Sequence, residues 1–185
     1  MNASVRLVPV GIANYHTIQN MARFYVYDMS EYLGHQTGWE IPLNGLYECI
    51  DFKMYWDNPK TQFPFLIYCG DEIAGFVIID KRGMNPDVDF NVAQFFIIRK
   101  FKRAGIGRRI AVDCFNQFIG KWNVMCLPEN VGAYKFWSSV IREYTQGQFE
   151  EYNNCKVSHL DDIYNVFQFC SHYLKQLPEQ DNARM

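Results

Sequence analysis

Two periodicities in the pattern of apolar and polar residues divide the chain into strands and helices. Short apolar or alternating runs bounded by turn residues predict strands, whereas apolar residues three and four positions apart predict helices. The expected strands cover residues 5–10, 63–70, 72–80, 88–98, 122–127, 142–152 and 162–170. The expected helices cover residues 12–33, 46–56 and 110–119, and a segment that begins after Asn130. This order predicts an α/β (α+β) fold in which helices lie on both faces of a mixed sheet.

Turn residues support these boundaries. Gly34 follows the first helix, and Asn58-Pro59 ends the second. Gly70-Asp71 predicts a hairpin between two strands, and a loop runs through residues 83–86. We therefore expect short connections between most elements.

The most informative stretch is RKFKRAGIGRR, residues 99–109, which places six basic residues around two glycines spaced one residue apart. A long apolar strand leads into it and an amphipathic helix leaves it. At such a strand-to-helix turn, backbone amides and the positive end of the helix dipole can bind an anion. The stretch therefore predicts an anion-binding turn.

Two familiar phosphate-binding loops do not fit this turn. A Walker loop needs four residues between its glycines and then Gly-Lys-Ser/Thr, and neither feature is present. A dinucleotide-binding fingerprint needs a third glycine, but Ile110 occupies that position, and no acidic residue follows at the expected distance. The anion is therefore not expected to belong to either of these ligand classes.

A third loop fits better. The segment from Lys102 to Gly107, KRAGIG, resembles the pyrophosphate loop of the GNAT superfamily of N-acetyltransferases, whose pattern is Gln/Arg-x-x-Gly-x-Gly/Ala. Lys102 replaces the usual Gln or Arg, which keeps a positive charge but loses the planar hydrogen-bonding geometry. Downstream, Asn130-x-x-Ala133-x-x-Phe136-Trp137 looks like the second cofactor segment of the superfamily, usually Asn-x-x-Ala-x-x-Phe-Tyr. The two motifs occur in the expected order.

The resemblance extends over nearly the whole chain and implies a mostly antiparallel GNAT-like sheet. It also implies acetyl-CoA as the donor substrate, an amine as the acceptor, and direct attack of the amine within a ternary complex. The residues from Phe136 to Ile141, followed by TQGQFEEY, are similar to a bacterial branch of predicted acetyltransferases. The acceptor and the length of the donor acyl chain are not specified by these motifs.

Twelve positions are implied to contact coenzyme A. In the superfamily the central strand separates from its neighbour and pairs with the pantetheine arm, while loop amides bind the pyrophosphate. The corresponding positions in this chain are Ile97, Ile98, Arg99, Lys102, Arg103, Ala104, Gly105, Ile106, Gly107, Arg108, Asn130 and Phe136.

Catalysis requires a neutral amine, because an amine with a pKa of about 10.4 is mostly protonated at neutral pH. Asp89 and Asn91 share one face of the central strand, and only Asp89 can act as a base. Its alternative role is that of a solvated aspartate at a strand start. In the superfamily a tyrosine commonly protonates the leaving thiolate, but Trp137 stands there, and indole is a donor without a usable acidic proton. Tyr134 is the substitute that we predict, although departure of the thiolate without an acid is also open.

The composition fits one domain. About half of the 185 residues are hydrophobic (49%), which is enough for one core, and we expect a single domain at residues 3–173 and a flexible tail at 174–185. A net charge of −2 argues against nucleic-acid binding, because the basic excess is confined to one turn. The sequence also lacks a recognisable secretory signal or membrane span, so we expect a cytoplasmic protein.

The six cysteines lie mostly in apolar segments without regular spacing, which predicts reduced thiols. The combination of Cys155-x3-His159 with Cys170-x-His172 does not have zinc-ligand spacing, so we expect no metal site. Two alternatives to an enzyme stay open: a nonenzymatic acyl-CoA-binding or sensing module, and a nucleic-acid-binding module that uses the RKFKR cluster. The sequence leaves open whether the protein is a monomer or a homodimer.

Overall fold

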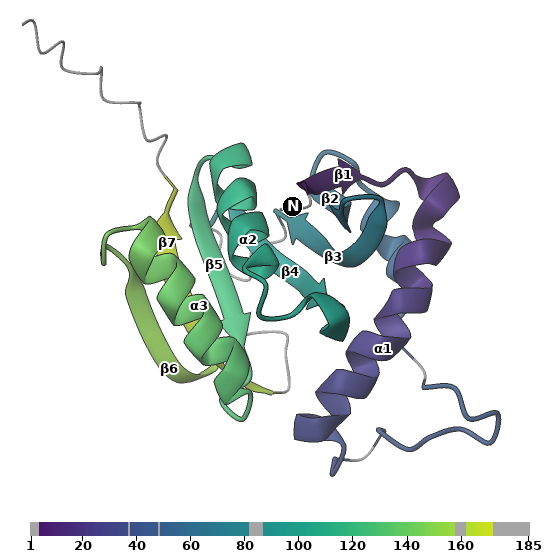
Figure 1. Ribbon diagram of the computed structural model, residues 1–185. Helices are drawn as coiled ribbons and strands as arrows, with labels where there is room; N and C mark the ends of the chain where they lie inside the picture. Colours follow the sequence, from purple (N-terminus) through teal and green to yellow (C-terminus); the bar gives the residue numbers. More distant parts are fainter. Residues whose placement is uncertain (1–3, 37, 48, 82–86, 158–161, 172–185) are drawn as a thin grey trace, which may run out of the picture.

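A seven-stranded sheet forms the centre of the molecule (Figure 1), and its strand order is β1-β2-β3-β4-β5-β7-β6. The computed structural model describes residues 4–36, 38–47, 49–81, 87–157 and 162–171. The strands are β1 Val5–Pro9, β2 Gln62–Cys69, β3 Glu72–Asp80, β4 Phe90–Ile97, β5 Lys121–Cys126, β6 Glu150–Lys156 and β7 Ile163–Cys170. Every neighbouring pair is antiparallel except β4 and β5, which run parallel. The predicted mixed, mostly antiparallel sheet is confirmed.

Helices cover both faces of this sheet. The helical elements are α1 Tyr15–Leu33, α2 Ile106–Gln117, α3 Val131–Tyr144 and the 3₁₀ turns η1 Ile12–Asn14, η2 Phe52–Trp56 and η3 Arg99–Phe101. Alternate residues of β3 show why two faces are needed: Val77 and Ile79 pack in one core with α2 and α3, whereas Phe76 and Ile78 pack in the other with α1 and η2. A strand that is apolar at consecutive positions is buried on both sides.

The prediction of a helix at residues 46–56 was wrong. Among the described residues of this stretch, only Phe52–Trp56 are helical, and they form the 3₁₀ turn η2. Side chains of α1 hold the preceding residues in a non-helical path: Gln19 accepts from the Phe52 amide at 2.7 Å and donates to the Ile50 carbonyl at 3.2 Å. Arg23 donates to the Tyr47 carbonyl at 2.6 Å. Backbone groups that a helix would have paired internally are therefore paired with another element.

The boundary of the expected strand at 142–152 was also wrong. Residues 142–144 continue α3, because Val140, Ile141 and Tyr144 extend its apolar stripe. Gly147, with φ of 85°, ends the helix and donates its amide to the Arg142 carbonyl at 2.8 Å, and β6 begins only at Glu150. The loop predicted at 83–86 and the tail predicted at 174–185 lie outside the described residues.

Candidate functional site

Strands β4 and β5 separate soon after they meet. They pair only where Phe90 and Asn91 face Trp122 and Asn123, although both strands continue beyond these positions. On the other edge of β4, the Ile98 amide donates to the Ala74 carbonyl at 2.8 Å. Because backbone groups alternate in direction along a strand, the amide and carbonyl of Ile97 point away from β3, toward the side of β5. The parting of the two strands thus leaves backbone groups available for an extended ligand.

The Ile98 backbone is not available in the same way. Its amide is paired with Ala74, and its carbonyl accepts from the Phe101 amide at 2.8 Å as η3 begins. Of the two isoleucines predicted to pair with pantetheine, Ile97 has the backbone orientation that this contact needs.

The turn between β4 and α2 presents a run of unpaired amides. Arg103 has φ of 65° and Gly105 has φ of 77°, and this backbone path aims successive N–H groups outward. Among the residues that the structure describes, no protein acceptor pairs with the amides of 103–108, whereas the next amide, Arg109, donates to the Gly105 carbonyl at 3.1 Å. These amides lie at the positive end of α2, which is the arrangement that binds a phosphate.

The two glycines of the turn have different physical roles. A Cβ added at Gly105 would meet no atom within 4 Å, so this glycine is needed for its positive φ rather than for space. A Cβ added at Gly107 would lie 3.3 Å from the Phe136 ring and 3.7 Å from Ile97. Gly107 therefore lets α2 approach α3, and residues from both motifs meet beside β4.

Asn130 has a structural task at the start of α3. Its carboxamide oxygen accepts from the Ala133 amide at 2.8 Å, which caps the helix as the sequence predicts. Ala133 follows three residues later on the same helix. The contact of Asn130 with a cofactor stays a prediction.

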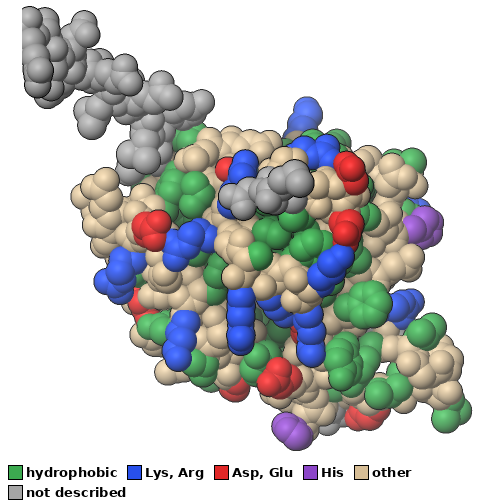
Figure 2. Space-filling model, viewed as in Figure 1, with side chains coloured by type: hydrophobic (Ala, Val, Ile, Leu, Met, Phe, Trp, Pro, Cys, Tyr) green, Lys and Arg blue, Asp and Glu red, His purple; other side chains and the backbone are tan. Residues whose placement is uncertain are grey.

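The basic side chains around the turn are tied to acidic partners. Asp28 of α1 accepts from Arg99 at 2.6 Å and from Lys102 at 2.9 Å. Burial raises the pKa of Asp28, but the bonds from these two cations outweigh it and hold the pKa below its ordinary value. Figure 2 shows Lys and Arg side chains gathered in the middle of the face viewed in Figure 1. The turn therefore combines free amides with cations that α1 positions.

Asp89, the predicted base, immediately precedes β4, two residues before Asn91, which is the last position of β4 that pairs with β5. Its carboxylate accepts from the Lys121 amide at 2.8 Å, and its own amide donates to the Lys121 carbonyl. At about 3.3 Å per residue, it is about 20 Å along the strand from Phe95. These contacts join the starts of β4 and β5 and do not bring Asp89 to the opening.

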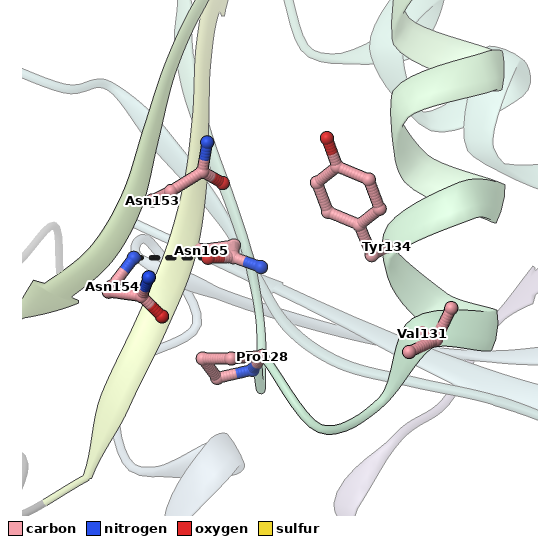
Figure 3. A pocket seen from close by; sticks show the side chains of 6 residues that line it. All are labelled: Pro128, Val131, Tyr134, Asn153, Asn154 and Asn165. Atoms are coloured by element: carbon pink, nitrogen blue, oxygen red, sulfur yellow. Dashed lines mark hydrogen bonds between the residues drawn. The ribbon is translucent and has the colours of Figure 1, made fainter.

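Tyr134, the predicted acid, points from α3 toward β6 and β7 (Figure 3). Its hydroxyl donates to Glu151 at 2.7 Å, and this bond raises the pKa of the phenol. Trp137, which stands where the superfamily has tyrosine, is buried against Phe95 with ring centroids 5.0 Å apart. The structure therefore does not bring Asp89 and Tyr134 together.

Polar residues that the sequence analysis did not select lie on the α1 face of the sheet. Burial raises the pKa of Tyr25 to about 12, and the nearby phenols of Tyr55 and Tyr164 add to this effect. Gln94 of β4 donates to the Tyr55 hydroxyl at 3.0 Å. These residues come from α1, η2, β4 and β7, so only the pairing of distant segments could have identified them.

Asn91 belongs to this same face, at the last paired position of β4. Its carboxamide nitrogen donates to Asp80 at 3.4 Å, while its carboxamide oxygen is buried and has no partner within the described part of the chain. On β5, the Asn123 carboxamide oxygen accepts from Gln168 at 3.0 Å. Asn91 and Asn123 thus place polar side chains at the last position where β4 and β5 pair, next to the point where the two strands separate.

Metal binding finds no support in the described residues, which contain no group of three or more potential ligands among His, Cys, Asp and Glu. The cysteines are free thiols, and burial raises the pKa of Cys114 to about 12. His159 and His172 lie outside the described residues. No described helix is long and apolar enough to span a membrane.

Comparison with known proteins identifies the fold. No protein-family model matches the chain, and no curated protein matches its sequence. An acetyltransferase from Thermus thermophilus superposes with a TM-score of 0.60 and 16% identity, over 91% of this chain and 98% of that one.

Two other solved structures agree. A spermidine N-acetyltransferase chimaera from Vibrio cholerae and hSSAT gives a TM-score of 0.57 at 10% identity, over 90% of this chain and 95% of that one. A GNAT-family acetyltransferase from Staphylococcus aureus Mu50 gives 0.52 at 11% identity, over 88% and 98%. The chain therefore has the GNAT fold, as its two motifs predict.

Proposed function

We propose that the protein is an acetyl-CoA-dependent N-acetyltransferase that acts on a primary amine of a small molecule or protein by direct attack within a ternary complex. The observation that carries this proposal is the turn at 103–108, whose unpaired amides stand beside the opening between β4 and β5. The GNAT fold supports the same conclusion.

The donor substrate fits this arrangement in two places. The pyrophosphate would accept hydrogen bonds from the amides of 103–108, with Lys102 and Arg99 contributing positive charge. The pantetheine arm would pair with the backbone of Ile97 as an added strand. The open space beside Gly105 leaves the backbone accessible to the phosphates.

The chemistry needs few protein groups. The neutral amine attacks the thioester carbonyl, a C–N bond forms, the C–S bond breaks, and coenzyme A departs as a thiolate while the amine proton passes to solvent. A thiol pKa of about 8.5 makes the thiolate a tolerable leaving group without an acid. The contacts of Asp89 and Tyr134 favour structural roles for both, so we propose that neither is required for proton transfer.

The polar groups on the α1 face are our candidates for contact with the acceptor. Tyr25 keeps its proton at neutral pH and can donate a hydrogen bond. The carboxamide oxygen of Asn91 is buried and unpaired within the described residues, so it can accept a hydrogen bond from a water that bridges to the acceptor.

A second function, that of a nonenzymatic acyl-CoA-binding or sensing module, is favoured by one observation. The position of the usual acid carries Trp137, which is buried, and the two other candidates are held in hydrogen bonds. Transfer of acetyl to any amine would exclude this alternative.

Both functions require coenzyme A to bind at the turn, and calorimetry with acetyl-CoA and coenzyme A tests this requirement. Gly105→Glu puts a negative charge in the turn and should abolish binding. Gly147→Glu is the matched control, because Gly147 also has positive φ and open space around it but follows the far end of α3. Loss of binding in both variants, or in neither, would contradict the proposed site. An amine panel with a free-thiol readout then separates the enzyme from the binding module.

A further inference from the structure

A pocket of about 470 Å³ lies between α3 and strands β6 and β7 (Figure 3). Its lining residues are Pro128, Val131, Tyr134, Asn153, Asn154 and Asn165. In the sheet order, β7 and β6 lie on the side of β5 that faces away from β4. The pocket is therefore a different place from the opening proposed for coenzyme A, and it is widely open to solvent.

Asn165 gives the pocket a hydrogen-bond donor with a fixed orientation. The residue is only 8% exposed, and its carboxamide oxygen accepts from the Asn154 amide at 3.1 Å. This bond fixes the orientation of the side chain, and Figure 3 shows its nitrogen pointing toward α3, into the pocket. Within the described residues no acceptor pairs with that nitrogen, so it is free to donate to a ligand or to solvent in the pocket.

An irregularity in β6 brings two more carboxamides to the same place. The pairing of β6 with β7 shifts register between Tyr152 and Cys155, and Asn154 adopts φ of 55°. Such a bulge removes residues from the ladder and redirects their side chains. Asn153 and Asn154 consequently line the pocket beside Asn165 (Figure 3).

The opposite wall is mostly apolar and rigid. Val131 and the ring of Tyr134 come from the first turn of α3, and Pro128 lies to their left in Figure 3. The bond from the Tyr134 hydroxyl to Glu151 holds the ring in place at the pocket edge. Among the described residues that line the pocket, none carries a formal charge at neutral pH.

We propose that this pocket binds one ring of a neutral, hydroxyl-rich molecule such as a hexose. Each carboxamide both donates and accepts, which matches hydroxyl groups that do the same. The tyrosine ring offers an apolar surface to the C–H face of a sugar ring. None of the described lining residues is cationic, which disfavours phosphates and nucleotides as occupants. The Glu151 carboxylate at the pocket edge already accepts from the Tyr134 hydroxyl, which disfavours polyamines. The inference is independent of the transferase activity.

Nuclear magnetic resonance titration tests this site directly. D-glucose, D-galactose and N-acetyl-D-glucosamine are the probes, and the carboxamide resonances of the three asparagines are the readout. We expect at least one sugar to give saturable shifts there, with a Kd on the order of 1 mM, as befits a small ligand with few contacts. Spermidine and N-methylacetamide serve as charged and simple-amide probes and should give no saturable shift at the same concentrations.

Two pairs of variants separate the pocket from general effects. Asn153→Ala removes a carboxamide that lines the pocket and should weaken sugar binding at least about fivefold. Gln148→Ala, which removes an exposed carboxamide outside the pocket, should leave binding unchanged. Tyr134→Phe keeps the ring and should bind within about twofold of wild type, whereas Tyr134→Ala should bind at least about fivefold more weakly.

Several outcomes would overturn the proposal. These are the absence of saturable shifts with every sugar, equal loss in Asn153→Ala and Gln148→Ala, and tighter binding of spermidine or N-methylacetamide. Gly105→Glu tests the separation from the cofactor turn: sugar binding should survive in it while acetyl-CoA binding is lost. If both are lost in a folded protein, the sugar occupies the cofactor opening instead.

Discussion

Gly107 shows at the scale of one residue how the two motifs depend on each other. The first motif needs a small residue there because the Phe136 ring, from the second motif, lies 3.3 Å from where a Cβ would stand. Phe136 also packs beside Phe95 of β4, with ring centroids 5.8 Å apart. A substitution at either position should therefore alter the packing of the other residue.

Gly107→Val should lower the free energy of unfolding by about 1–3 kcal/mol, because the added side chain overpacks the contact with Phe136. Urea denaturation measures this effect. Adding Phe136→Leu makes room, so the double variant should be more stable than the sum of the two single changes implies. Strict additivity would mean that the ring does not lie against Gly107.

Asn91 provides a second test at this scale. Asn91→Asp would place a carboxylate beside Asp80 in a buried position, and we expect a loss of several kcal/mol of stability at neutral pH. Protonation relieves the repulsion, so the loss should shrink as the pH falls toward 4. Urea denaturation at the two pH values measures it. Asn91→Leu adds no charge, and a similar pH-dependent loss in that variant would rule out repulsion from Asp80 as the cause.

At the scale of elements, α1 links the proposed acceptor side of the sheet to the turn at residues 103–108. Asp28 pairs with the turn through Arg99 and Lys102. Tyr25, three residues earlier on the same helix, packs against Phe76 and Phe96. Because i and i+3 positions share one side of a helix, these contacts hold α1 in one orientation over the sheet.

Asp28→Asn should lower stability slightly at neutral pH, since the paired cations are largely in solvent. The carboxyl pKa is lower in the folded state than in the unfolded state. The stability that the Asp28 carboxylate contributes is therefore present at pH values above its pKa in the unfolded state. It is lost as the pH falls through its pKa in the folded state. Urea denaturation at pH 7 should separate wild type from variant, and the difference should close in acid. A difference that persists in acid would point to packing rather than charge.

At the scale of the whole molecule, binding at the turn should stabilise the entire fold. A ligand at 100 times its Kd adds about 2.7 kcal/mol to the free energy of unfolding, which for a chain of this size raises Tm by about 5–10 °C. Thermal denaturation with and without acetyl-CoA measures this rise. Gly105→Glu should show none, whereas Gly147→Glu should respond as wild type does. A rise that persists in Gly105→Glu would place the ligand elsewhere.

The sequence by itself determined the elements whose signals are local. The amphipathic helices α1, α2 and α3, the Gly70-Asp71 hairpin and the Asn130 cap depend on residues within a few positions of one another, and all were predicted. The turn at residues 103–108 belongs to this class, because a glycine ahead of a helix favours the positive φ that Gly105 adopts. The two motifs together therefore predicted the fold.

Only the tertiary structure decided which side chains meet. Gln19 and Arg23 of α1 bond to the backbone of Tyr47, Ile50 and Phe52 and hold these residues out of a helix. The Lys121 amide donates to the carboxylate of Asp89. The Glu151 carboxylate accepts a hydrogen bond from the Tyr134 hydroxyl. These partners lie on separate elements, and strand register and helix packing set which groups touch, so periodicity along the chain carries no information about them. The carboxamide pocket depends on the same long-range pairing, because it exists only where a bulge in β6 faces Asn165 of β7.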